Sequence, residues 1–245
     1  MSNIWTIARR EYKLFFFSPI AYVFLFVTLL LLGLFFYLDL FFAVTTQQFV
    51  PGAQRTIQLY IFPMLFLGIP VLTMRTIADE NRSGTLELLL TAPIHDWELV
   101  IGKWLGSLLF FLTSTLVTLV YPLILNFQLD PGIDWGVVIS AYTGLILLIS
   151  TMCAVGVSVS SFFSNPVAAM FASLGMMIIF WIIGSPAQVT GGTFTQVLGY
   201  LGFPDHFYDS FMRGIIRAQD VIFYVSMTIF ALALGSTSVE TRRWR

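Results

Sequence analysis

The chain has 245 residues, of which 58% are hydrophobic and only 10% are charged, and its net charge is −1. Soluble domains carry about 25% charged residues, so this chain has too few charged residues to cover a surface that faces water. Intrinsic disorder is excluded as well, because it needs low hydrophobicity and high charge. We therefore expect an all-α membrane protein, with residues 1–245 forming a single transmembrane domain.

Residues 1–17 predict an amphipathic helix that precedes the first membrane span. At 100° per residue, its apolar side consists of Ile4, Trp5, Ala8, Tyr12, Phe15 and Phe16, and its polar side of Asn3, Thr6, Arg9, Arg10 and Lys13. A helix of this pattern is typical of one that lies in the membrane interface. Two roles stay open for it, which are to anchor the topology or to dock a partner.

Six segments have the length and apolar character of transmembrane helices, each of which needs about 20 apolar residues. They are residues 19–42, 57–74, 104–127, 137–162, 166–185 and 220–238. The second segment contains Pro63, Gly68 and Pro70. Since proline in a membrane helix frees backbone groups that neighbouring protein must satisfy, we expect this helix to face other helices and to be kinked.

The basic residues predict the orientation. With the N-terminus in the cytoplasm, nine lie inside, namely Arg9, Arg10, Lys13, Arg75, Arg82, Lys103, Arg242, Arg243 and Arg245, and three lie outside, namely Arg55, Arg213 and Arg217. The positive-inside rule favours this arrangement. An even number of spans then places both termini in the cytoplasm, and the multi-pass chain belongs in a bacterial-type cytoplasmic (inner) membrane.

Residues 75–93, between the second and third spans, predict a helical elbow on the cytoplasmic side. Ser83-Gly84 interrupts a first helical piece, and Thr85 is suited to cap a second, leucine-rich one that Pro93 ends. Asp96 is suited to cap the third span. The elbow would present charged and apolar side chains to the cytoplasm.

This stretch resembles the signature of ABC-2 type permeases, the membrane subunits of one class of ATP-binding-cassette exporters. The residues that carry the pattern are Arg75, Ala78, Glu80, Gly84, Thr85, Glu87, Leu89, Leu90 and Pro93. The similarity covers the whole chain and implies an ABC-2, or type V exporter, fold. That fold has six spans, an interfacial N-terminal helix, a coupling helix between spans two and three, and a re-entrant hairpin before span six.

The resemblance implies that the elbow is a coupling helix seated in a cleft of a separate ATP-binding subunit. The residues expected to couple to this ATPase are Arg75, Glu80, Arg82, Gly84, Thr85, Leu86, Glu87 and Leu89. ATP and Mg²⁺ would bind in the partner subunit, and no cofactor in this chain. The competing interpretation is that Glu80 and Glu87 only cap and solvate a cytoplasmic loop.

Residues 186–219 combine glycines and prolines with aromatic patches, and the resemblance implies a re-entrant hairpin on the outward side. The run 205–222 is similar to that of gliding-motility-associated permeases, which implies a membrane-anchored accessory subunit. We expect His206 to be a surface histidine between aromatic neighbours. The spacing of Asp205, Asp209, Arg213 and Arg217 predicts a solvated helix face.

The resemblance also implies a second permease copy or paralogue, with the transport pathway between spans two and five. The residues expected to line that pathway are Phe62, Met64, Phe66, Met170, Phe171 and Met177. Methionines and aromatic residues at helical spacing are also typical of a plain helical core. Both interpretations stay open for these six residues.

The sequence lacks the residues that several classes of function require. No phosphate-binding glycine loop is present, so we expect no ATP hydrolysis by this chain. His95 and His206 are predicted on opposite sides of the membrane, and Cys153 is a single cysteine, so we expect no metal site. The near absence of charge in the span centres disfavours proton-coupled transport. No basic run is long enough for nucleic acid, and the expected surroundings are the lipid bilayer.

The sequence therefore predicts a non-enzymatic permease subunit that couples ATP hydrolysis in a partner to substrate export. The alternative is a non-transporting module that transmits force to a periplasmic partner or remodels the envelope. An intramembrane enzyme is a third alternative, but the sequence lacks convergent acid, base or metal-ligand residues.

Overall fold

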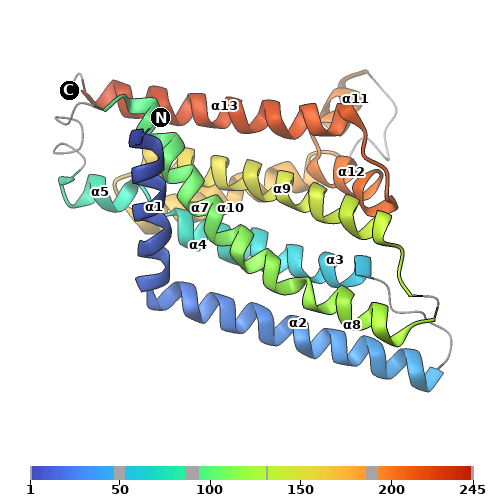
Figure 1. Cartoon of the computed structure of the whole chain (residues 1–245). Helices are drawn as coiled ribbons and strands as arrows, with labels where there is room; N and C mark the ends of the chain where they lie inside the picture. The colour runs from blue at the N-terminus through green and yellow to red at the C-terminus, as the bar shows by residue number, and fades with distance from the viewer. Residues whose placement is uncertain (1, 47–52, 86–93, 131, 186–192, 244–245) are drawn as a thin grey trace.

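The computed structural model describes residues 2–46, 53–85, 94–130, 132–185 and 193–243, which form helices joined by turns with no strand among them (Figure 1). The helices are α1 (Ser2–Phe17), α2 (Pro19–Thr46), α3 (Ala53–Pro63), the π-helix η1 (Met64–Gly68), α4 (Ile69–Thr73), α5 (Ala78–Arg82), α7 (Asp96–Thr118), α8 (Val120–Gln128), α9 (Trp135–Phe162), α10 (Pro166–Ile182), α11 (Thr193–Tyr200), α12 (Phe203–Tyr208), the 3₁₀-helix η3 (Phe211–Arg213) and α13 (Ala218–Arg243).

Five helical stretches among the described residues are long and apolar enough to cross a membrane. They are Pro19–Thr45, Gln54–Arg82, Asp96–Gln128, Trp135–Phe162 and Ala218–Thr241. These correspond to five of the six predicted spans. The predicted fifth span is the shorter apolar helix α10, whose 17 residues extend about 26 Å, against a hydrocarbon core of about 30 Å. A sixth crossing by α10 stays a prediction.

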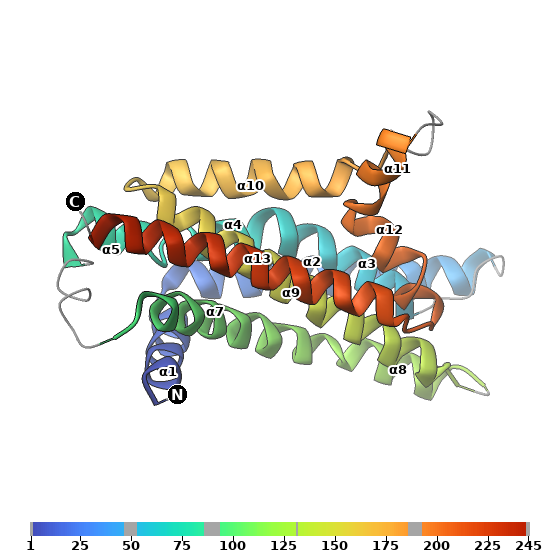
Figure 2. The ribbon, with the colours of Figure 1, turned by 90° about the horizontal axis from the view of Figure 1, so that it is seen from above.

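The long helices run alternately in opposite directions along one bundle (Figure 1). One end of the bundle holds α1, α5 and the C-terminal part of α13, and the other end holds α11 and α12 (Figures 1 and 2). Helix α10 follows the length of the bundle and packs against α9, η1 and α4 (Figure 2). The elbow and the insertion before α13 therefore lie at opposite ends of the molecule.

Helix α1 lies across the end of the bundle (Figure 1), and it is amphipathic, as predicted. Ala8 and Phe15 are buried on its inner side, whereas Arg9, Arg10 and Lys13 are exposed. Trp5 departs from the prediction, because the helix turns it outward and its surface is 58% exposed. An exposed face that mixes tryptophan with basic residues is typical of membrane interfaces.

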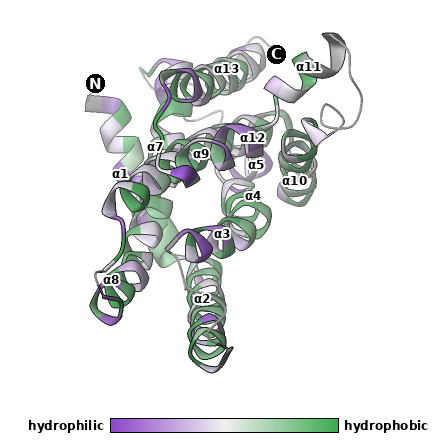
Figure 3. Ribbon diagram, turned by 90° about the vertical axis from the view of Figure 1, so that its right-hand side faces the viewer, coloured by the Kyte–Doolittle hydropathy of each residue, from purple (hydrophilic) through white to green (hydrophobic). Residues whose placement is uncertain are grey.

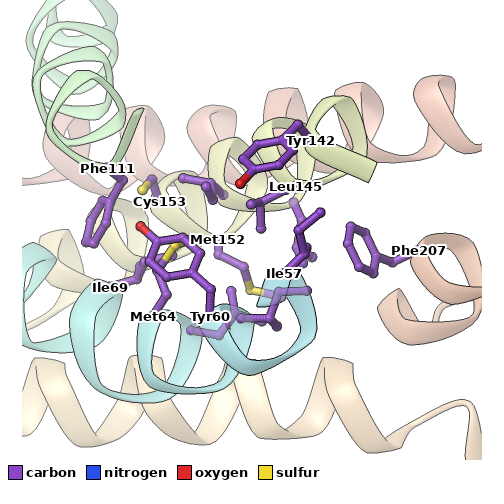
Figure 4. Close-up of a cluster of buried hydrophobic side chains, with 14 of the residues drawn as sticks. Ile57, Tyr60, Met64, Ile69, Phe111, Tyr142, Leu145, Met152, Cys153 and Phe207 are labelled. Carbon is purple, nitrogen blue, oxygen red and sulfur yellow. The ribbon is translucent and has the colours of Figure 1, made fainter. Parts of the chain in front are cut away.

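Helix α9 forms the centre of the bundle. Of its most apolar stretch 78% is buried, against 17% for α2, and α2 stands at the periphery with hydrophobic residues all round (Figure 3). The core beside α9 includes Tyr60, Met64 and Met152 (Figure 4). Cys153 is fully buried there as a small residue of the core. The apolar surface of α2 needs lipid or another chain to cover it.

The second span is interrupted where the sequence predicts it. Pro63 ends α3, and the next residues form the π-helix η1 before α4 begins at Ile69. A Cβ atom at Gly68 would overlap the Phe24 ring of α2, so any larger residue there would require that ring to move. In the whole span 61% of the apolar stretch is buried, which confirms that this helix faces other helices.

Candidate ATPase-coupling site

The elbow starts with the short helix α5 and a turn of three exposed residues, Ser83, Gly84 and Thr85. The Ser83 hydroxyl donates to the Asp79 carbonyl at 2.8 Å and lies 2.9 Å from the Thr85 hydroxyl. Gly84 has φ +71°, a left-handed conformation that favours glycine. The turn therefore ends α5 as the sequence predicts. Leu86, Glu87 and Leu89, also predicted to couple, lie outside the described residues.

A single serine of α9 holds the start of the elbow. The Ser160 hydroxyl accepts from the backbone N–H groups of Ile77 and Ala78 at 3.2 and 3.0 Å, and donates to the Met74 carbonyl at 3.0 Å. The first N–H groups of a helix lack partners within the helix, and no side chain of the elbow caps α5. Asn81 adds a further bond to the Phe163 carbonyl at 3.2 Å. The elbow is thus attached directly to the central helix of the bundle.

A buried lysine connects the elbow with α1 and α7. The Lys103 ammonium lies 2.9 Å from Glu11 Oε1 and 2.8 Å from Glu80 Oε1, and it donates to the Thr76 carbonyl at 2.5 Å. The Lys103 side chain is 1% exposed. Three donors on one ammonium therefore meet three acceptors from α1, from α5 and from the turn before α5. Buried charges are tolerated only when they are paired and hydrogen-bonded in this way.

This network changes the interpretation of Glu80. Its side chain points inward to Lys103 and is only 15% exposed, so the described geometry gives it a positioning role within this chain. Arg75 and Arg82, by contrast, are exposed, together with Gly84 and Thr85, although Arg75 also lines the side of the elbow that faces α1. These four predicted coupling residues are the ones that a partner protein can reach.

The third span begins with a different cap from the predicted one. The structure places His95 at the N-cap and Asp96 in the first helical turn, because the Glu98 carboxylate accepts from the His95 backbone N–H at 3.1 Å. The same Glu98 oxygen accepts from the Asn3 amide at 3.2 Å. The cap thus connects the N-terminal end of α1 to the start of α7. The predicted cap at Asp96 includes no such contact.

Two glycines of α7 allow α1 to approach closely. A Cβ atom added to Gly106 would lie 2.5 Å from Glu11 Cβ and 2.9 Å from the Ala8 carbonyl oxygen, and one added to Gly102 would lie 2.7 Å from Ile7 Cβ. Small residues that let helix backbones approach are typical of membrane-protein interfaces. The Gly106 contact sets the position of Glu11, and therefore one arm of the Lys103 network.

We expect Gly106→Ala to displace α1 from α7. The atoms that the new methyl group would meet belong to the backbone or lie next to it, so they cannot move aside as a flexible side-chain end would. Overpacking of this kind costs about 1–3 kcal/mol, and it should lower the apparent melting temperature of the purified protein. Gly175→Ala in α10 is the matched control, since nothing lies within 4 Å of its added Cβ. Equal melting temperatures for the two variants would contradict the proposed close contact.

A family model described as ABC-2 family transporter protein matches residues 5–198. The match covers most of the chain and includes α1, the elbow and all helices up to α10. The chain belongs to the ABC-2 transporter family. Members of this family are membrane components of transporters, so this ABC-2 chain is a multi-pass membrane protein of an ABC transport system. No curated protein sequence matches the chain.

The family match does not reach the segment on which the gliding-motility resemblance rests, because that segment begins at Asp205. The resemblance to that subgroup therefore stays a prediction. The same holds for the accessory subunit that it implies.

The six predicted pathway residues of the ABC-2 chain do not share one environment. Met64 and Met177 are buried in the core, and Phe66 and Met170 are half-buried. Phe62 of α3 and Phe171 of α10 are exposed. For the two buried methionines, the structure favours the plain-core interpretation that the sequence left open. A lining role stays a prediction for the exposed pair.

The insertion before α13 contains a buried histidine, which corrects the expectation of a surface residue. His206 is 8% exposed and its Nδ1 lies 2.6 Å from Asp220 Oδ1, while its Nε2 lies 2.8 Å from the Tyr200 carbonyl oxygen. Its ring also stacks on Phe223. Asp209 and Arg213 form an exposed ion pair at 2.7 Å. The single solvated helix face that the spacing predicts is absent from these described residues, because Asp205 lies in α12, Arg213 in η3 and Arg217 between η3 and α13. The insertion is therefore tethered to α13 through His206.

Two residues that hold the elbow, Ser160 and Lys103, were not predicted from the sequence. Ser160 has no local signal, because hydroxyl residues are ordinary in membrane helices. Lys103 did have one, since it stands among apolar residues directly before the predicted third span, where a charge is costly without a partner. The acids available to pair with it were the Glu11 and Glu80 carboxylates, but their positions depend on the tertiary packing.

Proposed function

We propose that this chain is the permease subunit of an ABC-2 exporter and that the elbow couples it to a separate ATP-binding subunit. The observation that carries the proposal is the two-sided elbow. It is bonded to Ser160 and Lys103 on its inner side, while the side chains of Arg75 and Arg82 are exposed. An element that is bonded to the bundle and exposed to a partner suits the transmission of movement.

The physical requirement is rigid transmission. Closure of ATP-binding subunits is a rigid-body movement, and a loop that bends would absorb it. The elbow is bonded to α9 through Ser160 and to both α1 and α7 through Lys103. A displacement of α5 would therefore reach three helices at once. Nucleotide shifts the permease only by its differential affinity for the two states, so contacts at Arg75 and Arg82 should differ between them.

We further propose six membrane crossings, with the elbow end in the cytoplasm. Helix α10 would supply the sixth, since it follows the length of the bundle between the two ends (Figure 2). Arg9, Arg10 and Lys13 of α1 lie at the elbow end, and Arg213 belongs to the insertion at the other (Figure 1). By the positive-inside rule, both termini would then lie on the cytoplasmic side of the cytoplasmic membrane.

The assembly that fits this proposal contains two permeases and two ATP-binding subunits. ATP and Mg²⁺ would be held by the ATP-binding subunits. Residues 1–245 of each permease would act as one membrane domain. A second permease would cover apolar surface that a single chain leaves exposed, as at Phe62 and Phe171.

Co-purification in detergent tests the proposal. The chain would be expressed with the ATP-binding protein encoded beside it, as wild type, as Arg82→Glu and as the double variant Glu87→Arg with Leu89→Asp. We expect the ATPase to co-elute with the wild type. We expect at least tenfold less with either elbow variant, because each reverses charge or polarity at the contact.

Arg213→Glu is the matched control for this experiment. Arg213 is as exposed as the elbow arginines but lies in the insertion, and its surface ion pair with Asp209 is worth at most about 1 kcal/mol. This control should retain the ATPase. Failure of any ATPase to bind the wild type, or equal loss with Arg213→Glu, would contradict the coupling role.

A further inference from the structure

A pocket opens beside the Lys103 network, between α1, the start of α2 and the elbow. Its volume is about 340 Å³, within the usual range of small-molecule sites. One part of its wall is apolar, formed by Leu14, Phe15, Ile20, Val71 and Leu72. The other part is charged, formed by Arg10, Glu11, Arg75, Asp79, Glu80 and Lys103. Its lining is therefore amphiphilic.

Most of these charges are already paired. Lys103 bonds both Glu11 and Glu80 through their Oε1 atoms, and Arg75 lies 4.0 Å from Asp79. Two groups are left over. Glu80 Oε2 is buried and has no hydrogen-bond partner, which is costly for a carboxylate oxygen. The exposed Arg10 guanidinium forms no salt bridge among the described residues, although its charge interacts with the Glu80 carboxylate.

The unused groups specify the chemistry of a ligand. Glu80 Oε2 requires a hydrogen-bond donor, best a cationic one, and Arg10 favours an anion such as phosphate. The apolar wall favours hydrocarbon. We propose that this pocket binds a zwitterionic phospholipid whose head carries a primary ammonium, that is, a phosphatidylethanolamine. The ammonium lies toward Glu80, the phosphate toward Arg10, and the acyl chains along Leu14 and Val71.

The place of the pocket agrees with a lipid as occupant. It lies where α1 turns into α2 at Ser18, so an interfacial helix meets a membrane-spanning one there. In a bilayer this is the level of the lipid head groups. A choline head would fit less well, since its quaternary nitrogen has no N–H to donate, and a glycerol head has no cation for Glu80.

Lipid binding can be measured on the purified full-length chain by native mass spectrometry and by the rise in melting temperature. The probes are dioctanoyl-phosphatidylethanolamine, the matching choline and glycerol lipids, and glycerophosphoethanolamine, which is the head group without chains. We expect the ethanolamine lipid to bind at least tenfold more tightly than the choline lipid, about the effect of one charge-assisted hydrogen bond. The chain-free head group should bind far more weakly, because it lacks the apolar contacts.

Neighbouring arginines of α1 provide the variant and its control. Arg10→Gln should weaken ethanolamine-lipid binding about tenfold, whereas Arg9→Gln should not, since Arg10 lines this pocket and Arg9 does not. Glu80→Gln should reduce the preference for ethanolamine over choline. Equal affinity for all three lipids, or equal effects of Arg9→Gln and Arg10→Gln, would overturn the proposal. Tight binding of glycerophosphoethanolamine would overturn the assignment of a lipid and indicate a soluble phosphoamine as the ligand. None of these readouts requires the ATP-binding partner.

Discussion

Replacing Lys103 with methionine should destabilise the protein more than any other single change that we propose. The substitution preserves the length and apolar stem of the side chain but leaves the Glu11 and Glu80 carboxylates facing each other without their cation. Breaking a buried charge network by removing one member typically costs about 3–5 kcal/mol. The apparent melting temperature at pH 8, where carboxyl groups are ordinarily ionised, should fall by roughly 10 °C.

The control for Lys103→Met removes the whole network. A triple variant that combines it with Glu11→Gln and Glu80→Gln eliminates the uncompensated charges, and replacing an entire buried ion network is often neutral. The triple variant should therefore recover most of the lost stability. If Lys103→Met were as stable as the wild type, or if the triple variant were no better than the single one, the network would not hold α1, α5 and α7 together.

Ser160→Ala should release the elbow while the bundle stays folded. The change removes the acceptor of the Ile77 and Ala78 N–H groups and the donor to the Met74 carbonyl. Each buried group left unsatisfied costs about 1–3 kcal/mol, and this loss falls on the elbow rather than on the core. Amide hydrogen exchange of residues 74–82, measured by mass spectrometry, should accelerate at least tenfold. In a complex with the ATP-binding subunit, stimulation of ATP hydrolysis by substrate or lipid should fall in parallel.

Ser161→Ala is the matched control. Ser161 is the next residue of α9 and is equally buried, but its hydroxyl donates only to the Ser158 carbonyl of its own helix, at 2.7 Å. Exchange in the elbow should stay at the wild-type rate in this variant. An equal acceleration in both variants would mean that general loosening of α9, and not the Ser160 bonds, governs the elbow.

Much of the fold was predictable because membrane insertion imposes strong local rules. Runs of about 20 apolar residues predict spans from composition alone, and five of the six predicted segments have the required length and apolar character. The interruption at Pro63 and the turn at Gly84 were also predictable, since both depend on the backbone chemistry of single residues. For helix α10, length alone does not decide whether the segment crosses the membrane.

The predictions that failed concern residues whose environment depends on distant parts of the chain. His206 was expected at the surface from its neighbours in sequence, but the start of α13, 14 residues along the chain, places Asp220 against it. The expected cap Asp96 gave way to His95, because the Glu98 carboxylate bonds the His95 N–H and the Asn3 amide of α1. In both cases a polar group found its partner in another helix, which a local pattern does not record.

The sequence by itself determined that this protein is a helical membrane protein, where its main spans lie, and which segment carries the ABC-2 signature. Apolar length, proline and glycine act locally, so their consequences can be derived without a fold. Only the tertiary structure decided that Glu80 turns inward to Lys103, that Ser160 holds the elbow and that a charged pocket lies beside α1. Buried polar groups must be paired, and packing alone determines which partners lie within reach.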